Sequence, residues 1–394
     1  MSPEDQIPTY NPMPWSVAEL KAVIPARCFK RSLGTSVMYL TRNISISAGA
    51  FYIALSLDHF LSGPSALSYL SILWASIFRW SSWIFYWWFQ GLMFVNFWAY
   101  GHECTHNALS PFRRVDDAIG FVLFSFLGTP YYSWQMSHVI HHSHRGHAEK
   151  DVSFVPPTRS DLKIPTHEDT MEYSDFFEDA PFFTLGKLIL RQQIGYLAFL
   201  IDLRSTSPKT ESLVCHFLPS STMFRHRYKD VVLSDMGILV MGGLLFYATQ
   251  SFGIIWLIKT YGIPWVALNN WIVLITYLHH TAPEIPYYRG KTWNFQRGAL
   301  STVDRNPLGR LGQFFFLNAG HFHVVHHLFP QIPWYHLEEA TNHLKAFIGD
   351  YYVYSDEPIL KALWRSFTEC QFVEDEGEVL FYRNAKGKAR AKDQ

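Results

Sequence analysis

Residues 101–110 read GHECTHNALS, residues 133–147 read SWQMSHVIHHSHRGH, and residues 323–327 read HVVHH. In all three stretches histidines recur at separations of three or four residues. On an α-helix this spacing places side chains on one face, one turn apart. The histidines with this spacing are His102, His106, His138, His141, His142, His323, His326 and His327. The sequence therefore predicts three helical histidine clusters.

The number of histidines predicts a centre that holds more than one metal ion. A zinc site is almost always satisfied by about four ligands, so eight imidazoles exceed what one zinc ion needs. Among the first-row metals, imidazole suits iron. We therefore predict two iron ions held by histidine, with no catalytic side chain beyond the metal centre and no other cofactor site.

The composition indicates a membrane protein. The chain has 394 residues, with 32 Phe, 21 Tyr and 14 Trp, and an aromatic excess is typical of side chains at membrane interfaces. The formal net charge of +0 gives no support for a nucleic-acid partner. The four cysteines are scattered without a CxxC pair, which indicates a reducing compartment. We predict an all-α polytopic membrane protein with a large polar cap.

Four apolar runs are candidates for membrane crossings, since a crossing needs about 20 residues. They cover about 44–61, 82–100, 231–249 and 252–278. The basic residues Arg27, Lys30 and Arg31 precede the first run, which favours a cytosolic N-terminus. The predicted domains are a cytosolic N-terminal segment, 1–40, and a membrane domain, 41–394, whose cap is formed by 101–228 and 279–394.

Two further apolar segments are not expected to cross. The run 119–134 contains Gly128 and Pro130 and is shorter than a crossing, so we expect a re-entrant or interfacial segment. The run 182–203 carries Lys187 and Arg191, which favours an amphipathic helix on the membrane surface. A further helix is expected at 337–348. With this count of crossings, all three histidine clusters lie on one side of the membrane.

Several motifs resemble the membrane fatty-acid desaturases, and most closely their Δ12 (omega-6) branch, which includes oleate desaturases and acetylenases. Three histidine boxes in this order and spacing are typical of that family. The resemblance extends to WSVAELKAVIPARCFKRSL (15–33), RGALSTVDR (297–305), HVVHHLFPQIPWYH (323–336) and EATNHLKAFIGDYY (339–352). It covers nearly the whole chain, so it is far more specific than a single histidine box.

The resemblance implies a fold, a ligand set and partners. The fold is four transmembrane helices beneath a cytosolic helical cap, with the metals at the boundary and an acyl tunnel. The eight box histidines would be ligands, His280 would be a ninth, and His279 competes with it for that role. The implied reaction is O2-dependent desaturation of a lipid acyl chain at two iron ions. The implied electron donors are cytochrome b5 and NADH-cytochrome b5 reductase, and the implied location is the endoplasmic reticulum membrane with the active site facing the cytosol.

Other polar residues near the boxes are expected to support the ligands or to lie at the surface. Ligating imidazoles need acceptors for their second ring nitrogen. The candidate acceptors are Glu103, Asp116, Asp117, Asp151 and Asp304. We expect His144, His147 and His321 to support ligands or to be exposed, and we expect His336 to be a packing or hydrogen-bonding residue.

Three stretches depart from the pattern of the branch. The first box usually reads HECGHH and here reads HECTHN (102–107). The usual QHTHP is HHTAP (279–283), and the usual Asp-Thr before the third box is His321-Phe322. The ligand spacing is intact, so the departures concern the site of oxidation and the substrate.

Three alternative functions stay open at this point. One is a divergent acetylenase that makes an alkyne on an acyl or prenyl-type chain. Another is a membrane di-iron hydroxylase. The third is a histidine-rich metal transporter, which is disfavoured because the clusters flank the apolar runs, whereas transporter sites lie near the bilayer midplane.

Overall fold

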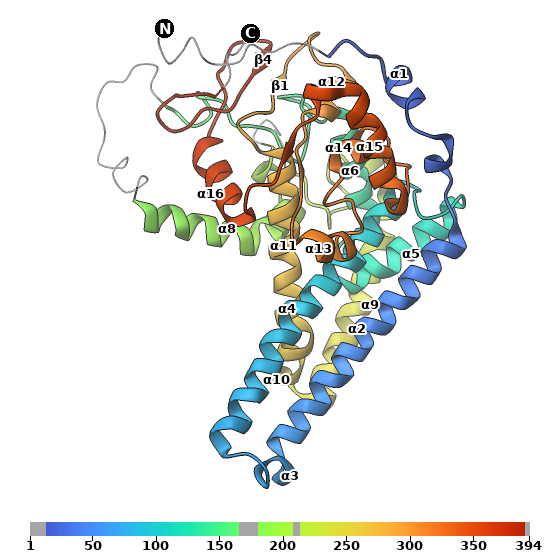
Figure 1. Cartoon of the computed structure of the whole chain (residues 1–394), viewed down its shortest axis with the longest axis vertical. Coiled ribbons are helices and arrows are strands. Elements are labelled where there is room, and N and C mark those ends of the chain that lie inside the picture. Colours follow the sequence, from blue (N-terminus) through green and yellow to red (C-terminus); the bar gives the residue numbers. More distant parts are fainter. Residues whose placement is uncertain (1–12, 165–179, 208–212, 391–394) are drawn as a thin grey trace.

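The computed structural model describes residues 13–164, 180–207 and 213–390, so the first twelve residues of the predicted N-terminal segment lie outside it. The described chain is mostly helical. Four long helices form two hairpins beneath a cap of shorter elements (Figure 1). They are α2 (Leu33–Ser62), α4 (Ile72–Thr105), α9 (Tyr228–Phe252) and α11 (Ile263–His280). Both hairpins lead the chain back to the cap, where the histidines lie.

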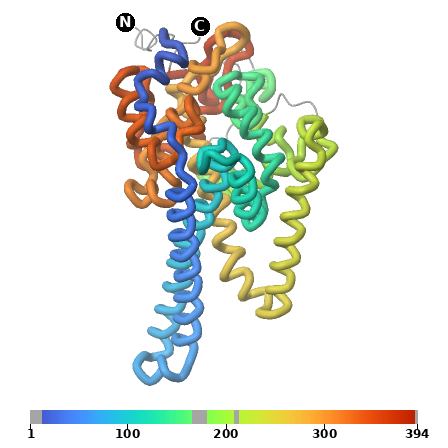
Figure 2. Tube along the Cα trace, turned by 90° about the vertical axis from the view of Figure 1, so that its right-hand side faces the viewer, coloured from blue at the N-terminus to red at the C-terminus, as the bar shows by residue number. Residues whose placement is uncertain are grey.

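The first hairpin consists of α2 and α4, joined through the short helix α3 (Pro64–Leu67). Ser32 and Ser71 cap α2 and α4, because each serine side chain accepts a backbone N–H of the first turn. This hairpin reaches further from the cap than the second one (Figures 1 and 2). At its other end, where α4 stops, the hairpin brings the first histidine box into the base of the cap.

The second hairpin consists of α9, α10 (Ile254–Leu257), the π-helical turn η5 (Ile258–Gly262) and α11. Gly253 makes the turn with a φ of 85°, which glycine adopts without steric cost. Asp58 of α2 accepts hydrogen bonds from Arg79 at 2.6 Å and from Lys259 at 3.3 Å. This charged group ties the two hairpins together at the end remote from the cap.

Within residues 13–164, 180–207 and 213–390, two helices are long and apolar enough to cross a membrane: Leu33–Ser62 and Arg225–Phe252. Helix α4 is also long, but Trp and Tyr lower its hydropathy. Helix α11 is preceded by the π-helical turn and has 18 residues of its own. The number of four crossings therefore stays a prediction.

The run 119–134 is divided between two helices, α5 (Arg113–Phe126) and α6 (Tyr131–His144). Gly128, with a φ of 72°, and Pro130 separate them. Each helix has 14 residues, which is shorter than the about 20 residues of a crossing. Helix α6 lies at the base of the cap, beside the end of α4, and carries the second box.

Helix α8 (Pro181–Ile201) lies across the base of the cap, close to the predicted range 182–203 (Figure 1). It exposes large apolar side chains, among them Phe182 and Ile189. It packs closely against α11, since a Cβ on Gly195 would lie 3.3 Å from Val273. Helix α8 therefore presents one face to the surroundings and its other face to α11.

The rest of the cap is built from short elements. They are α1 (Val17–Ala22), η2 (Ala26–Phe29), η3 (Leu203–Ser205), η4 (Arg225–Arg227), α12 (Phe295–Leu300), α13 (Gly309–Phe315), α14 (His323–Leu328), η6 (Trp334–His336), α15 (Leu337–Ile348), η7 (Gly349–Tyr351) and α16 (Ile359–Glu369). In the described part of the cap, four two-residue strands complete it: β1 (Tyr287–Tyr288) pairs antiparallel with β4 (Val379–Leu380), and β2 (Asp304–Arg305) pairs parallel with β3 (Tyr354–Ser355). The helix predicted at 337–348 is confirmed.

Candidate metal centre

The three histidine boxes lie on three different helices that meet beneath the cap. The first is at the C-terminal end of α4, the second on α6, and the third on α14. A fourth contribution, His280, comes from the last residue of α11. The prediction of helical clusters is confirmed, and the fold brings all of them together.

One set of imidazoles, the five-histidine cluster, joins all three boxes. It consists of His102, His106, His138, His142 and His326, whose ligand atoms lie within 4.8 Å of one another. The Nε2 atoms of His106 and His138 are 2.9 Å apart, and those of His102 and His326 are 3.1 Å apart. Nitrogens from residues as far as 224 positions apart in the sequence therefore converge on one point.

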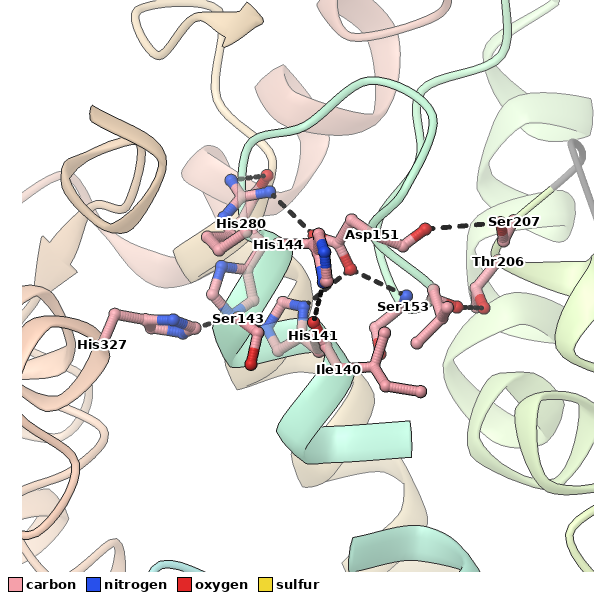
Figure 3. A network of polar contacts seen from close by, with 12 residues as sticks. Ile140, His141, Ser143, His144, Asp151, Ser153, Thr206, Ser207, His280 and His327 are labelled. Atoms are coloured by element: carbon pink, nitrogen blue, oxygen red, sulfur yellow. Dashed lines mark hydrogen bonds and ion pairs between the residues drawn. The ribbon is translucent and has the colours of Figure 1, made fainter. Parts of the chain in front are cut away.

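A second set, the four-histidine cluster, consists of His141, His280, His323 and His327. The Nε2 of His280 lies 3.3 Å from that of His141, 3.1 Å from that of His323 and 3.3 Å from that of His327. The side chains of His141, His280 and His327 approach one another in Figure 3. All nine predicted ligand residues belong to one of the two clusters.

The nitrogen atoms of both clusters fit metal binding. Burial lowers the pKa of His106, His138 and His142 well below the usual value, and the neighbouring histidines lower it further. These three imidazoles are therefore neutral, which is the form that binds metals. Among the described residues, neither ring nitrogen of His142 has a hydrogen-bond partner. Buried nitrogens without partners are costly, and a cation would satisfy them.

His141 is oriented by a buried carboxylate. Its Nδ1–H donates to Oδ1 of Asp151 at 2.8 Å, which leaves Nε2 directed at the four-histidine cluster (Figure 3). Ser153 donates its backbone N–H to the same oxygen at 3.0 Å. Burial acts to raise the pKa of Asp151, but His141 and Arg145 outweigh it and hold that pKa below its usual value. Asp151 therefore supports a cluster histidine, as the sequence predicted.

Glu103 lies behind the five-histidine cluster. Its Oε1 is 3.5 Å from Nδ1 of His102 and 3.9 Å from Nδ1 of His326, and the residue is fully buried. Burial raises its pKa. One carboxyl group thus faces the Nδ1 atoms of two rings that are 224 residues apart in the sequence.

The other predicted acceptors serve the backbone or other side chains. Asp116 accepts from Ser110, and Asp117 accepts from Tyr131 at 3.0 Å. Asp304 accepts the backbone N–H of Val324 at 2.7 Å. Asp304 therefore positions the helix that carries the third box rather than a ring nitrogen.

The other histidines singled out in the sequence, all within the described residues, lie outside both clusters. His279 donates from Nδ1 to the carbonyl oxygen of Val303 at 2.7 Å, while its neighbour His280 enters the four-histidine cluster. His321 lies with Nε2 3.1 Å from the carbonyl oxygen of Gly309. His144 contacts the carbonyl oxygen of Ile140, His147 accepts the backbone N–H of Glu149, and His336 faces Glu339.

Arg145 is a site residue that the sequence did not predict. It is 1% exposed and donates to the carbonyl oxygens of His280 at 2.9 Å and of Ser301 at 2.6 Å. Its guanidinium also lies 3.7 Å from Asp151. Arg145 therefore links the second box to the end of α11. The one feature of the sequence that could have indicated this role was the position of Arg145 shortly after the second histidine box.

A cavity of about 720 Å³ adjoins both clusters and is lined by α4, α6, α8 and α11. Its wall beside the histidines is aromatic. Trp134 stacks on His138 with ring centres 4.3 Å apart, and Phe154 lies 4.7 Å from His280. The cavity is mostly apolar and is large enough for a long hydrocarbon chain, because ligand sites generally measure about 300–1,000 Å³.

Comparison with known proteins identifies the family. The family model described as fatty acid desaturase matches residues 79–358. A Delta(12) fatty acid desaturase from Mortierella isabellina is 38% identical over 379 residues, covering 94% of this chain and 90% of that protein. An oleoyl-12-hydroxylase from Ricinus communis is 37% identical, covering 94% and 91%. An omega-6 fatty acid desaturase of the endoplasmic reticulum from Brassica juncea is 37% identical, covering 96% and 94%.

Proposed function

This chain belongs to the fatty acid desaturase family, and from that premise we propose that it is a Δ12-type desaturase with a di-iron centre. The family makes it an oxidoreductase that acts in lipid metabolism. The observation that carries the di-iron proposal is the convergence of nine imidazoles, all of them buried or partly buried, in two clusters beside an apolar cavity. In this proposal the reaction removes two hydrogens from a methylene pair of an acyl chain while O2 is reduced to water.

Each cluster is proposed to hold one iron ion. The ligands would be His102, His106, His138, His142 and His326 for one ion, and His141, His280, His323 and His327 for the other. When bound, the iron ions would supply the O2-dependent oxidation of an unactivated C–H bond, chemistry that amino-acid side chains do not provide. Imidazole ligands are consistent with iron.

The role of the protein in this proposal is to place and shield the chain. The apolar cavity would hold the hydrocarbon in an extended form against the aromatic wall of Trp134 and Phe154. Because these rings exclude water, the oxidant would meet only the substrate. Asp151 and Arg145 would keep His141 and the end of α11 in place.

Electrons must reach the centre from outside. We propose cytochrome b5 and NADH-cytochrome b5 reductase as donors, following the family resemblance. A cytosolic cap is the surface that such a donor would meet. Purified chain in lipid vesicles with both donors should oxidise NADH in step with product formation, and a full rate without cytochrome b5 would contradict the assignment.

We propose the endoplasmic reticulum membrane as the location, because the relative from Brassica juncea carries that name. In this topology α2, α4, α9 and the α10–α11 segment cross the bilayer, and the cap and both termini face the cytosol. Helix α8 lies on the membrane surface, with its apolar face towards lipid. A glycosylation sequon placed in the turn around Ser65–Ser71 should be modified, and one placed near Gly387 should not. The reverse pattern would overturn the topology.

The decisive test is expression in a yeast of known lipid composition, followed by analysis of new double and triple bonds. The proposal predicts a new Δ12 double bond in the wild-type culture. His141→Ala should abolish the product, because it removes a cluster imidazole, and should leave membrane insertion intact. A fully active His141→Ala variant would contradict the di-iron assignment.

The names of the relatives and the altered histidine boxes leave two alternative reactions open. One relative carries the name oleoyl-12-hydroxylase, and Thr105 and Asn107 adjoin the cluster residue His106. The alternatives are therefore an acetylenase acting on an acyl or prenyl-type chain and a hydroxylase. The same yeast analysis separates them, because an alkyne or an alcohol would replace the ordinary double bond. The transporter alternative is dropped, since the family is enzymatic.

A further inference from the structure

A cluster of different composition lies apart from the nine histidines. Cys28 of η2 approaches His336 of η6 and Glu339 of α15, and their ligand atoms all lie within 4.8 Å of one another. Cys28 is fully buried, whereas His336 and Glu339 are partly exposed. His336 and Glu339 are three residues apart, but Cys28 lies more than 300 residues before them, so the fold and not local spacing brings the thiol to the other two side chains.

We infer that Cys28, His336 and Glu339 form a second metal site, which binds one Zn²⁺ ion. Thiolate, imidazole and carboxylate are the ligands that zinc takes in proteins, with bond lengths of about 2.0–2.3 Å. Tetrahedral zinc separates its ligand atoms by roughly 3.3–3.8 Å at these bond lengths. The observed group therefore needs to contract by about 1 Å to seat the ion.

The contacts of the group explain how zinc would enter. The ion displaces the thiol proton of Cys28 to solvent and replaces the guanidinium of Arg27, which pairs with Glu339. The Arg27 side chain is 66% exposed, so it can turn into solvent without losing buried contacts. One thiolate and one carboxylate then balance the two positive charges of the ion. A water molecule completes the coordination on the exposed side.

Such a site would fasten the N-terminal segment to the element that follows the third histidine box. Neighbouring contacts already join these regions: Phe29 packs edge-to-face on Phe329, and Ser32 donates its backbone N–H to the hydroxyl of Tyr335 at 2.9 Å. Bound zinc would add a cross-link at this junction. Its role would be to hold these two segments together, because the cluster is separate from the cavity residues.

Cobalt titration tests the site, because Co²⁺ replaces zinc and gives a charge-transfer band only with a thiolate ligand. The full chain in detergent, with its histidine clusters loaded with iron, should develop this band, and added Zn²⁺ should remove it. Cys28→Ser should lack the band and hold one zinc fewer per chain than wild type. Cys215→Ser is the matched control. It should keep both the charge-transfer band and the wild-type zinc content, because Cys215 lies outside the cluster.

Two further variants keep the test decisive if Cys28→Ser does not fold. Glu339→Gln should weaken cobalt binding at least tenfold, because it removes a ligand at a partly exposed position. Arg27→Gln breaks the ion pair between Arg27 and Glu339 without removing a ligand, so this variant should bind cobalt as tightly as wild type or more tightly. No thiolate band in wild type, or an unchanged band in both Cys28→Ser and Glu339→Gln, would overturn the inference.

Discussion

The indole N–H of Trp98 donates a hydrogen bond to the hydroxyl of Tyr196 at 3.0 Å, while the Trp98 ring lies nearly parallel to the His102 imidazole, at an interplanar angle of 17°. Thr129 contacts the same hydroxyl at 3.0 Å. The side chains of Trp98 and Tyr196 also line the cavity. One hydrogen bond between α4 and α8 thus fixes both a wall of the cavity and the ring that covers a cluster histidine.

Tyr196→Phe should change the product distribution without lowering the iron content. The variant keeps the aromatic ring and removes the hydroxyl that accepts the Trp98 N–H and contacts Thr129, so the indole gains freedom beside the chain. A displacement of about 1 Å at a reacting centre can cost roughly 100-fold in rate, so we expect a displaced chain to be oxidised at a different carbon. Lipid analysis and metal analysis of the same preparation give both quantities. Unchanged products would show that the hydrogen bond serves stability alone.

Asp151→Asn should lower iron affinity or activity by about 10- to 100-fold, the usual effect of altering a residue that supports a metal-binding histidine. The amide can still accept from His141, but it lacks the charge that strengthens this bond and faces Arg145. Iron content and turnover in purified protein measure the effect. Asp350→Asn, at an exposed position of the cap, is the control and should leave both values unchanged.

Restoring the family residues with Thr105→Gly, Asn107→His and His321→Asp should keep iron bound and shift the products. Thr105 donates to the carbonyl oxygen of His102 at 2.7 Å, and Asn107 has a φ of 55° directly after His106. Both can reposition the first box. If wild type makes only linoleate from oleate and the triple variant does the same at the same rate, the departures are neutral.

His321→Asp alone should contribute little to that shift. The structure places the His321 ring against the carbonyl oxygen of Gly309, outside both histidine clusters. The sequence had placed it beside His323 by position alone. Product analysis of the single variant against the Thr105→Gly/Asn107→His pair separates the two contributions.

Gly298→Ala should destabilise the cap by about 1–3 kcal/mol, the usual cost of overpacking. A Cβ at Gly298 would lie 2.0 Å from the carbonyl oxygen of Arg145, a backbone atom that cannot turn away. Because Arg145 supports the end of α11, iron content should fall as well. Gly186→Ala is the control, since no atom lies within 4 Å of its added Cβ. Thermal unfolding in detergent compares the two variants.

His216 should make the folded cap sensitive to acid. Its ring is fully buried, contacts Ser137 at 2.8 Å, and burial lowers its pKa from 6.5 to about 4. A depressed histidine pKa means that the stabilisation is complete above pH 6.5 and is lost as the pH falls towards 4. The loss amounts to about 2 kcal/mol at pH 5. His216→Gln should remove this part of the pH dependence of the unfolding midpoint. A variant whose pH profile is identical to that of the wild type would contradict the prediction.

Much of the helical architecture followed from local pattern. The amphipathic run at 182–203 became α8, and the helix expected at 337–348 has those bounds. The interruption at Gly128 and Pro130 separates α5 from α6, because a positive φ and a missing N–H act within the segment itself. Helix ends were less well predicted: α4 extends ten residues before the expected start at 82, since Trp and Arg obscure the apolar pattern there.

By itself the sequence determined the identity of eight of the nine cluster histidines, because a spacing of three or four residues is a property of one helix. Only the tertiary structure decided how they are shared between two clusters: His102 meets His326 across 224 residues, and His141 and its neighbour His142 enter different clusters. It also decided between His280 and His279, placed Arg145 behind the site, and joined Trp98 to Tyr196. These outcomes depend on how separate helices rotate and pack against one another, and that packing is set by contacts between distant segments that no local pattern contains.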